Sequence, residues 1–305
     1  MKALAWALAL ALASGMGPAN AGDAALPLCV AKDLDAHPVN PDGDEAARRA
    51  TLAAWEEEGA QASAYEKFQL GAFYRLGRSH PAALVERDIA KARPLLAHAA
   101  LGGQLAAMAS SAELELEHGE PMAGMVWAQL YAFYMQREHP SQFRTYQADL
   151  IKRGFDALPR GEKTDREIEA LVRGFLDKHG ARIDEALASR GDDDSTADRK
   201  CRPVHEVYPT RLELKGDRVP LAGGHGAVSR HRLYDPGLAM YRLHIAPSGE
   251  VVQAMVVESL PGPAAGKGLM RSVQRLRFNP VAEDAPTRVV LLPMSYDDSS
   301  VRIRD

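Results

Sequence analysis

The feature that most constrains the fold of this 305-residue chain is a change of hydrophobic period near residue 200. From about 46 to 188, apolar side chains recur at steps of three and four residues, as at Tyr65, Phe68 and Phe73, which predicts amphipathic helices. After 201, apolar and polar residues alternate in short runs, which predicts strands. The sequence therefore predicts an α+β protein, with a helical N-terminal region and a small C-terminal region containing a sheet.

The polar, acidic segment RGDDDSTADRK separates these two regions and is typical of a linker. The expected organisation is a signal peptide (1–21), a lead-in (22–45), a helical repeat domain (46–190), a linker (191–203) and a C-terminal domain (204–305).

The residue pattern of the C-terminal region predicts the element order β-β-α-β. Tyr241, Leu243 and Ile245 alternate with Arg242 and His244, the sequence PSG forms a turn, and a second strand runs back. A helix is expected over 264–278, followed by a strand in TRVVLLPMSYD, with the helix covering one face of an antiparallel sheet.

This helix is expected to end where Asn279 meets Pro280, because proline disfavours a helical residue before it. We expect Phe278 to be buried at this corner. The buried stripe is expected to contain Leu269, Val273 and Leu276, with Arg271, Arg275 and Arg277 pointing away from it.

The same region resembles the C-terminal domain of the energy transducer TonB over about 204–298. The residues that carry the resemblance are a Tyr-Pro pair, a turn glycine and an Arg-Phe-x-Pro corner: Tyr208, Pro209, Gly249, Arg277, Phe278 and Pro280. The resemblance implies a small sheet that binds another chain, in principle by adding a strand at its edge.

The helical region contains a weak repeat with a period of about 43 residues, starting at Gly59 and Gly102. Over about 60–135 it resembles the Sel-one-like repeat, a tetratricopeptide-like helical pair. The matching positions are Leu70, Gly71, Tyr74, Gly77, Ala99, Ala100, Gly102 and Ala106. The resemblance implies an α-solenoid-like stack of helical pairs, whose small residues let the helices approach closely.

Residues 1–21 are typical of a secretory signal peptide: Lys2 precedes an apolar run, and small residues occupy both cleavage positions at Ala19 and Ala21. Cleavage there would leave 36 basic and 41 acidic residues, a net charge of −5. An uncleaved membrane anchor and a buried N-terminal helix are the alternatives. Export predicts a periplasmic location, where Cys29 and Cys201 are expected to form a disulfide; two free thiols are the alternative.

No catalytic, metal or cofactor motif emerges from the sequence. Cys201 and His205 are four residues apart, but no second cluster supplies further zinc ligands. The segment GPAAGKGL lacks the spacing of a phosphate-binding loop. The charge of −4 gives no reason to bind nucleic acid.

The sequence therefore predicts a non-catalytic, exported protein that binds proteins of the bacterial cell envelope, without a cofactor or a small-molecule substrate. The alternative is an envelope transport accessory or a TonB-type energy transducer, held at the membrane by an uncleaved N-terminal helix.

Overall fold

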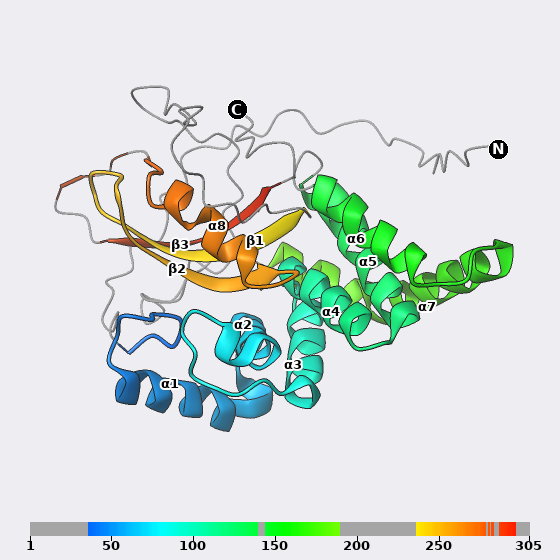
Figure 1. Ribbon diagram of the computed structural model, residues 1–305, viewed down its shortest axis with the longest axis horizontal. Helices are drawn as coiled ribbons and strands as arrows, with labels where there is room; N and C mark the ends of the chain where they lie inside the picture. Colours follow the sequence, from blue (N-terminus) through cyan, green and yellow to red (C-terminus); the bar gives the residue numbers. More distant parts are fainter. Residues whose placement is uncertain are drawn as a thin grey trace.

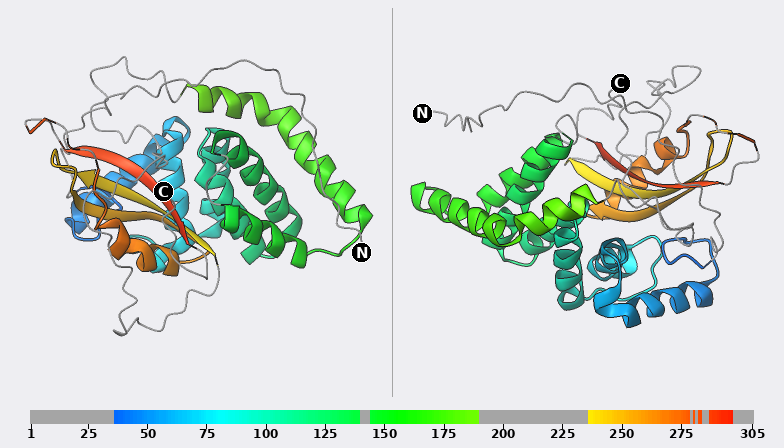
Figure 2. Two further views of the ribbon diagram at one scale, coloured as in Figure 1. Left: turned by 90° about the horizontal axis from the view of Figure 1, so that it is seen from above. Right: turned by 180° about the vertical axis from the view of Figure 1, so that it is seen from behind.

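A computed structural model describes residues 36–139, 144–189, 236–278, 280, 282–283 and 287–296. Within these ranges the protein is α+β. A three-stranded antiparallel sheet lies between one helix on its upper face and the N-terminal helices below (Figure 1). The further helices extend beyond the end of the sheet, as the views from above and behind show (Figure 2).

The helical region begins with α1 and ends with the long α7. Its α-helices are α1 (Glu45–Glu58), α2 (Ala64–Leu76), α3 (Ile89–Leu101), α4 (Leu105–Glu117), α5 (Pro121–Glu138), α6 (Arg144–Asp156) and α7 (Glu162–Ala188). Short 3-10 turns, η1 (Gly59–Gln61) and η2 (Gly77–Ser79), follow α1 and α2.

Local chemistry explains where α2 begins. The Ser63 hydroxyl accepts from the backbone N–H of Glu66, and the Glu66 carboxylate accepts from the backbone N–H of Ser63. This capping box satisfies donors that the first turn leaves free. From Phe68 to Leu76 every residue of α2 is buried, so this helix is surrounded by protein on all sides.

The helices pair as two consecutive hairpins, α2 with α3 and α4 with α5. In each hairpin a glycine lies close to a leucine of the partner helix. A β-carbon on Gly71 would lie 2.7 Å from the Leu96 side chain, and one on Gly124 would lie 2.7 Å from that of Leu116. Small residues therefore set the helix spacing, as the sequence predicted for Gly71.

The C-terminal elements follow the predicted order: β1 (Gly237–Ile245), β2 (Val251–Leu260), α8 (Ala264–Val273) and β3 (Arg288–Tyr296). The strand order is β2-β1-β3, and both pairs are antiparallel. Gly249 has a φ of 86° in the turn between β1 and β2, where its N–H donates to the Ala246 carbonyl at 2.9 Å. A side chain would be strained in this conformation.

The expected end of the last helix was wrong. α8 stops at Val273 rather than at Phe278, because Arg277 forms an isolated bridge with Glu250 and the Phe278 N–H donates to the Gly249 carbonyl at 2.7 Å. The stripe of Leu269, Val273 and Leu276 is buried as predicted. Phe278, however, is only partly buried, since it lies at the margin of this core.

The sheet is buried on both faces. Residues of β1 such as Tyr241 and Leu243 pack against α8. The opposite face joins the core of the helical region through Leu238, Met240, Met255, Val257, Leu260 and Leu291. Our expectation of a single covered face was therefore too simple, because the helices from the first half of the chain cover the second face.

Candidate functional site

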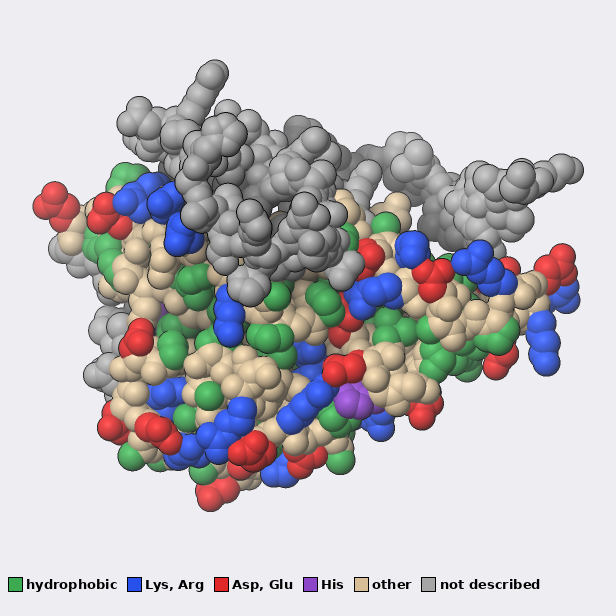
Figure 3. All heavy atoms as spheres, in the orientation of Figure 1, with side chains coloured by type: hydrophobic (Ala, Val, Ile, Leu, Met, Phe, Trp, Pro, Cys, Tyr) green, Lys and Arg blue, Asp and Glu red, His purple; other side chains and the backbone are tan. Residues whose placement is uncertain are grey.

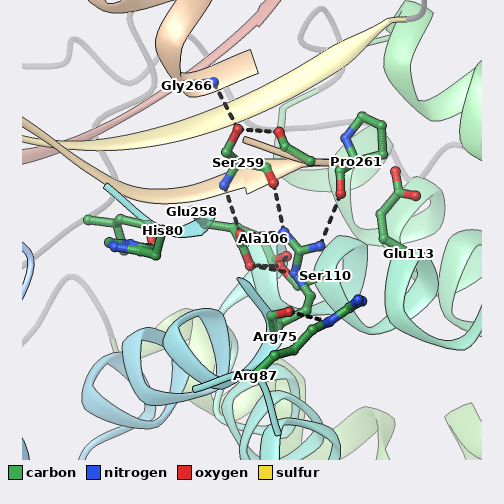
Figure 4. A network of polar contacts seen from close by, with 12 residues as sticks. Arg75, His80, Arg87, Ala106, Ser110, Glu113, Glu258, Ser259, Pro261 and Gly266 are labelled. Carbon is green, nitrogen blue, oxygen red and sulfur yellow. Dashed lines mark hydrogen bonds and ion pairs between the residues drawn. The ribbon is translucent and has the colours of Figure 1, made fainter. Parts of the chain in front are cut away.

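The contact between α2 and the sheet contains a buried ion pair (Figure 4). Arg75, near the end of α2, donates to both carboxylate oxygens of Glu258 on β2, at 2.6 Å from Nη2 and 3.3 Å from Nε. Both side chains are only 1 % exposed. The pair joins residues 183 positions apart and fixes the sheet on the helical region.

The other polar atoms of this pair are also satisfied. Arg75 donates to the carbonyls of Ser259 at 2.7 Å and Pro261 at 3.0 Å. Glu258 accepts from the Ser110 hydroxyl at 2.8 Å and from the Ser259 N–H at 2.7 Å. Burial alone would lower the pKa of Arg75, but the Glu258 carboxylate outweighs it and raises this pKa. We call this network of Arg75 and Glu258 a clamp, because it holds α2 on the sheet. Its polar atoms are bonded within the protein, so it leaves no group free for a ligand.

A second network holds α6 against α4. Arg153 donates to both oxygens of Glu113 at 2.6 Å, and the Tyr146 hydroxyl donates to Glu113 at 2.7 Å. Burial raises the pKa of Tyr146 well above its usual value. These bonds explain how Glu113 is buried without a large cost.

His80, just after η2, contacts β2 as a neutral imidazole. Its Nδ1 accepts from the Ala82 N–H at 3.0 Å, so its Nε2 carries the proton and faces the Val257 carbonyl at 3.3 Å. Burial lowers the pKa of His80 to about 4, against smaller opposing effects of the Val257 bond and Glu258. This residue is a second clamp between the helices and the sheet.

The most unusual site lies further along the same interface. We define the Arg242 cluster as Arg242 and His244 of β1, Tyr65 of α2 and His37 ahead of α1. Arg242 is 6 % exposed and His244 is 1 % exposed. Across the described part of the chain, no group bonds Arg242 Nε or Nη1 or either ring nitrogen of His244.

The charge of Arg242 acts on the other groups of the cluster. Burial and then the charge of Arg242 lower the pKa of His244 to about 4. Burial, Arg242 and His244 together place the pKa of His37 well below its usual value. Burial raises the pKa of Tyr65, while Arg242 opposes this effect through its charge and through a side-chain hydrogen bond. The cluster therefore contains one fixed positive charge among neutral groups that can donate hydrogen bonds.

The two edges of the sheet differ. The pairing of β2 with β1 has register shifts next to Tyr241 and Ile245 of β1. Glu250, the residue before β2, forms an isolated bridge with Arg277. β3 pairs with β1 in unbroken register from Arg288 to Tyr296, and none of the described strands pairs with its outer edge. Bulges make strand addition difficult, so β3 is the edge better suited to accept another strand.

Pro293 reveals the direction of the backbone groups in β3. It is opposite Met240 of β1, and proline has no N–H to donate. In an antiparallel pair, residues whose N–H groups point toward the partner strand alternate with residues whose N–H groups point away from it. Pro293 lies at an outward position, so Leu291 and Val289, two and four residues before it, direct their N–H groups outward.

The motif residues predicted from the sequence that lie in the described ranges belong to helices, turns and the segments that follow them. Leu70, Gly71 and Tyr74 lie in α2, and Gly77 follows it with a φ of 55°. Ala99, Ala100, Gly102 and Ala106 lie at the junction of α3 with α4. Gly249 forms a turn, Arg277 pairs with Glu250, Phe278 is partly buried and Pro280 is exposed. Cys29, Cys201, His205, Tyr208 and Pro209 lie outside the described residues.

Sequence reasoning missed Arg75, Glu258 and the Arg242 cluster. A signal existed: each of these charges interrupts an otherwise apolar run, as in GAFYRLG and AMYRLHI. Charged residues are seldom fully buried unless paired, so such positions usually indicate solvent exposure.

Among the described residues, no cluster of three His, Cys, Asp or Glu side chains is arranged to hold a metal ion. The helices in those same ranges are either too short or too polar to span a bilayer. Comparison with protein families, curated proteins and solved structures finds no match to this chain.

Proposed function

We propose that this protein is a non-catalytic, exported protein of the bacterial cell envelope that binds another protein by accepting a strand at the outer edge of β3. The observation that carries the proposal is the regular β3 edge, which has an unbroken register with β1 and outward N–H groups at Val289 and Leu291. Strand addition uses such backbone groups for affinity.

Two further observations support a protein partner. Both faces of the sheet are buried, so its edge is the part that remains for recognition. On the face drawn in Figure 3, acidic and basic side chains are interspersed over the helices. A mixed surface with a net charge of −4 favours a protein partner over nucleic acid. The helical hairpins would provide a second binding surface, in the manner of the Sel-one-like repeats that they resemble.

The test is crosslinking in cells, followed by identification of the bound proteins. Val289→Pro removes an N–H group that points away from β1, so it breaks no hydrogen bond between β3 and β1. Pro293 already occupies an equivalent position in the same strand. We expect this variant to lose partners that the unaltered protein captures. The matched control, Val252→Pro on β2, should retain them. Circular dichroism checks that both variants are folded. Equal capture by Val289→Pro would refute strand addition at β3.

The transducer alternative depends on the N-terminus, which lies outside the described residues. Mass spectrometry of the protein recovered from cells tests it directly. We expect a chain that starts at Gly22. A chain that retains residues 1–21 would instead support the anchored accessory or TonB-type transducer.

A further inference from the structure

The Arg242 cluster departs from the rule that buried charges are paired. Placing a guanidinium in the interior without an anion costs several kcal/mol. The nearby Arg75 shows how this chain meets that cost, with a carboxylate and two carbonyls. Arg242 is similarly buried, but among the described residues its Nε and Nη1 atoms have no hydrogen-bond partner. A negatively charged group that binds to the folded protein would compensate this cost.

The polar groups of this site come from separate elements. Arg242 and His244 project from the same side of β1, because they are two residues apart in a strand. Tyr65 of α2 lies close enough for Arg242 to shift its pKa. Gln69 lies one turn further along the same face of α2, is fully buried, and has no partner for either atom of its amide.

The acid adjacent to Tyr65 in the sequence does not fill the site. Glu66 is committed to the Ser63 N–H in the capping box. On the other side, Asn40 accepts from Gln253 at 3.0 Å, which fixes the segment ahead of α1 against β2. The site is therefore flanked by β1, α2 and the segment that carries His37.

We propose that the Arg242 cluster is a binding site for a carboxylate group. The planar guanidinium of Arg242 matches the two oxygens of a carboxylate, which it can bind in a bidentate manner. Neutral His244 and Tyr65 each supply a further donor, and Gln69 lies one helical turn from Tyr65. A single negative charge fits best, because the site has one fixed positive charge and its histidines are neutral. This site is independent of strand addition at β3.

The experiment measures thermal unfolding of the full mature chain against increasing sodium acetate. Sodium chloride at equal ionic strength and acetamide, the neutral analogue, are the controls. We expect acetate to raise Tm by about 5–10 °C at a hundred times its dissociation constant, while both controls have little effect. Equal shifts with acetate and sodium chloride, or none with acetate, would overturn the proposal and leave buried water as the partner. A larger shift with phosphate would also overturn it.

A variant pair identifies the residues responsible. Arg242→Met should raise Tm without ligand, because it removes an unpaired buried charge, and should abolish the response to acetate. Arg277→Met removes an exposed arginine from the same domain and should leave the response intact. If Arg242→Met retains the acetate response, the site is elsewhere and the assignment fails. If Arg242→Met does not fold, His244→Phe should weaken the response instead, and an unchanged response in that variant would overturn the site.

Two further arms distinguish the source of the carboxylate. A short uncharged peptide with a free C-terminus is compared with the same peptide amidated, and with acetate. A shift from the free peptide that exceeds that from acetate indicates a chain terminus. A shift from acetate alone indicates a small free acid. Either result supports the carboxylate site.

Discussion

Arg75 and Arg242 are both buried arginines at the contact between the helices and the sheet, but their surroundings differ. Arg75 is paired with an anion, whereas we expect the charge of Arg242 to lower the free energy of unfolding. Arg75 has a carboxylate and two carbonyls as partners. Glu258→Gln should therefore lower the free energy of unfolding by about 3–5 kcal/mol, because it leaves the Arg75 charge without its anion. Urea unfolding measures this loss.

Two controls sharpen that prediction. Glu86→Gln breaks an exposed pair with Arg78 and should leave stability nearly unchanged. Replacing both buried partners, as Arg75→Met with Glu258→Leu, should recover most of the loss, since a buried pair often gives little net stability over apolar residues. A loss below about 1 kcal/mol in Glu258→Gln would contradict the clamp.

The neutral state of His80 predicts that stability falls in mild acid. The pKa of His80 is about 4 in the folded protein, below its ordinary value of 6.5. The unfolded chain therefore binds the proton first as the pH falls below 6.5, which favours unfolding. His80 alone should lower the free energy of unfolding by about 2 kcal/mol between pH 8 and pH 5.

Urea unfolding of His80→Gln at both pH values tests this effect. The loss should shrink by about that amount, while His244, whose pKa is also about 4, still contributes. An unchanged pH dependence in His80→Gln would contradict the lowered pKa of His80 in the folded protein.

At the scale of the elements, the same substitution should have opposite effects in two helices. Gly71→Ala would place a β-carbon 2.7 Å from Leu96, so we expect it to destabilise the protein by about 1–3 kcal/mol. Gly174→Ala lies on the exposed side of α7 with no atom within 4 Å, and it should stabilise by about 0.5–1 kcal/mol. Thermal unfolding compares them, and equal effects would contradict a close contact between α2 and α3.

Local pattern was sufficient to predict the helical hairpins and the β-β-α-β order, because hydrophobic period and turn residues act over short distances. It could not predict the end of α8, which depends on the contact of Phe278 with Gly249. Nor could it predict the sites at the interface. Burial of Glu258 depends on Ser110, 148 residues away, and no local pattern encodes that partner.

At the scale of the whole molecule, the helices and the sheet share one core. The sequence suggested two domains joined by a linker. With Arg75, His80 and Ser110 bonded to β2, separation would expose apolar surface and unpaired polar groups together. We therefore expect the described helices and the sheet to unfold as one cooperative unit.

Native-state hydrogen exchange tests this cooperativity. Leu243→Ala creates a cavity on the α8 side of the sheet, where this leucine is fully buried, and should cost about 2–5 kcal/mol. In one cooperative unit, α2 on the opposite face should lose protection by the same free energy as β1. Leu171→Ala, exposed on α7, should leave both unchanged. Loss of protection in β1 alone would mean that the sheet opens independently of the helices, in which case Arg75 and Glu258 would not couple them.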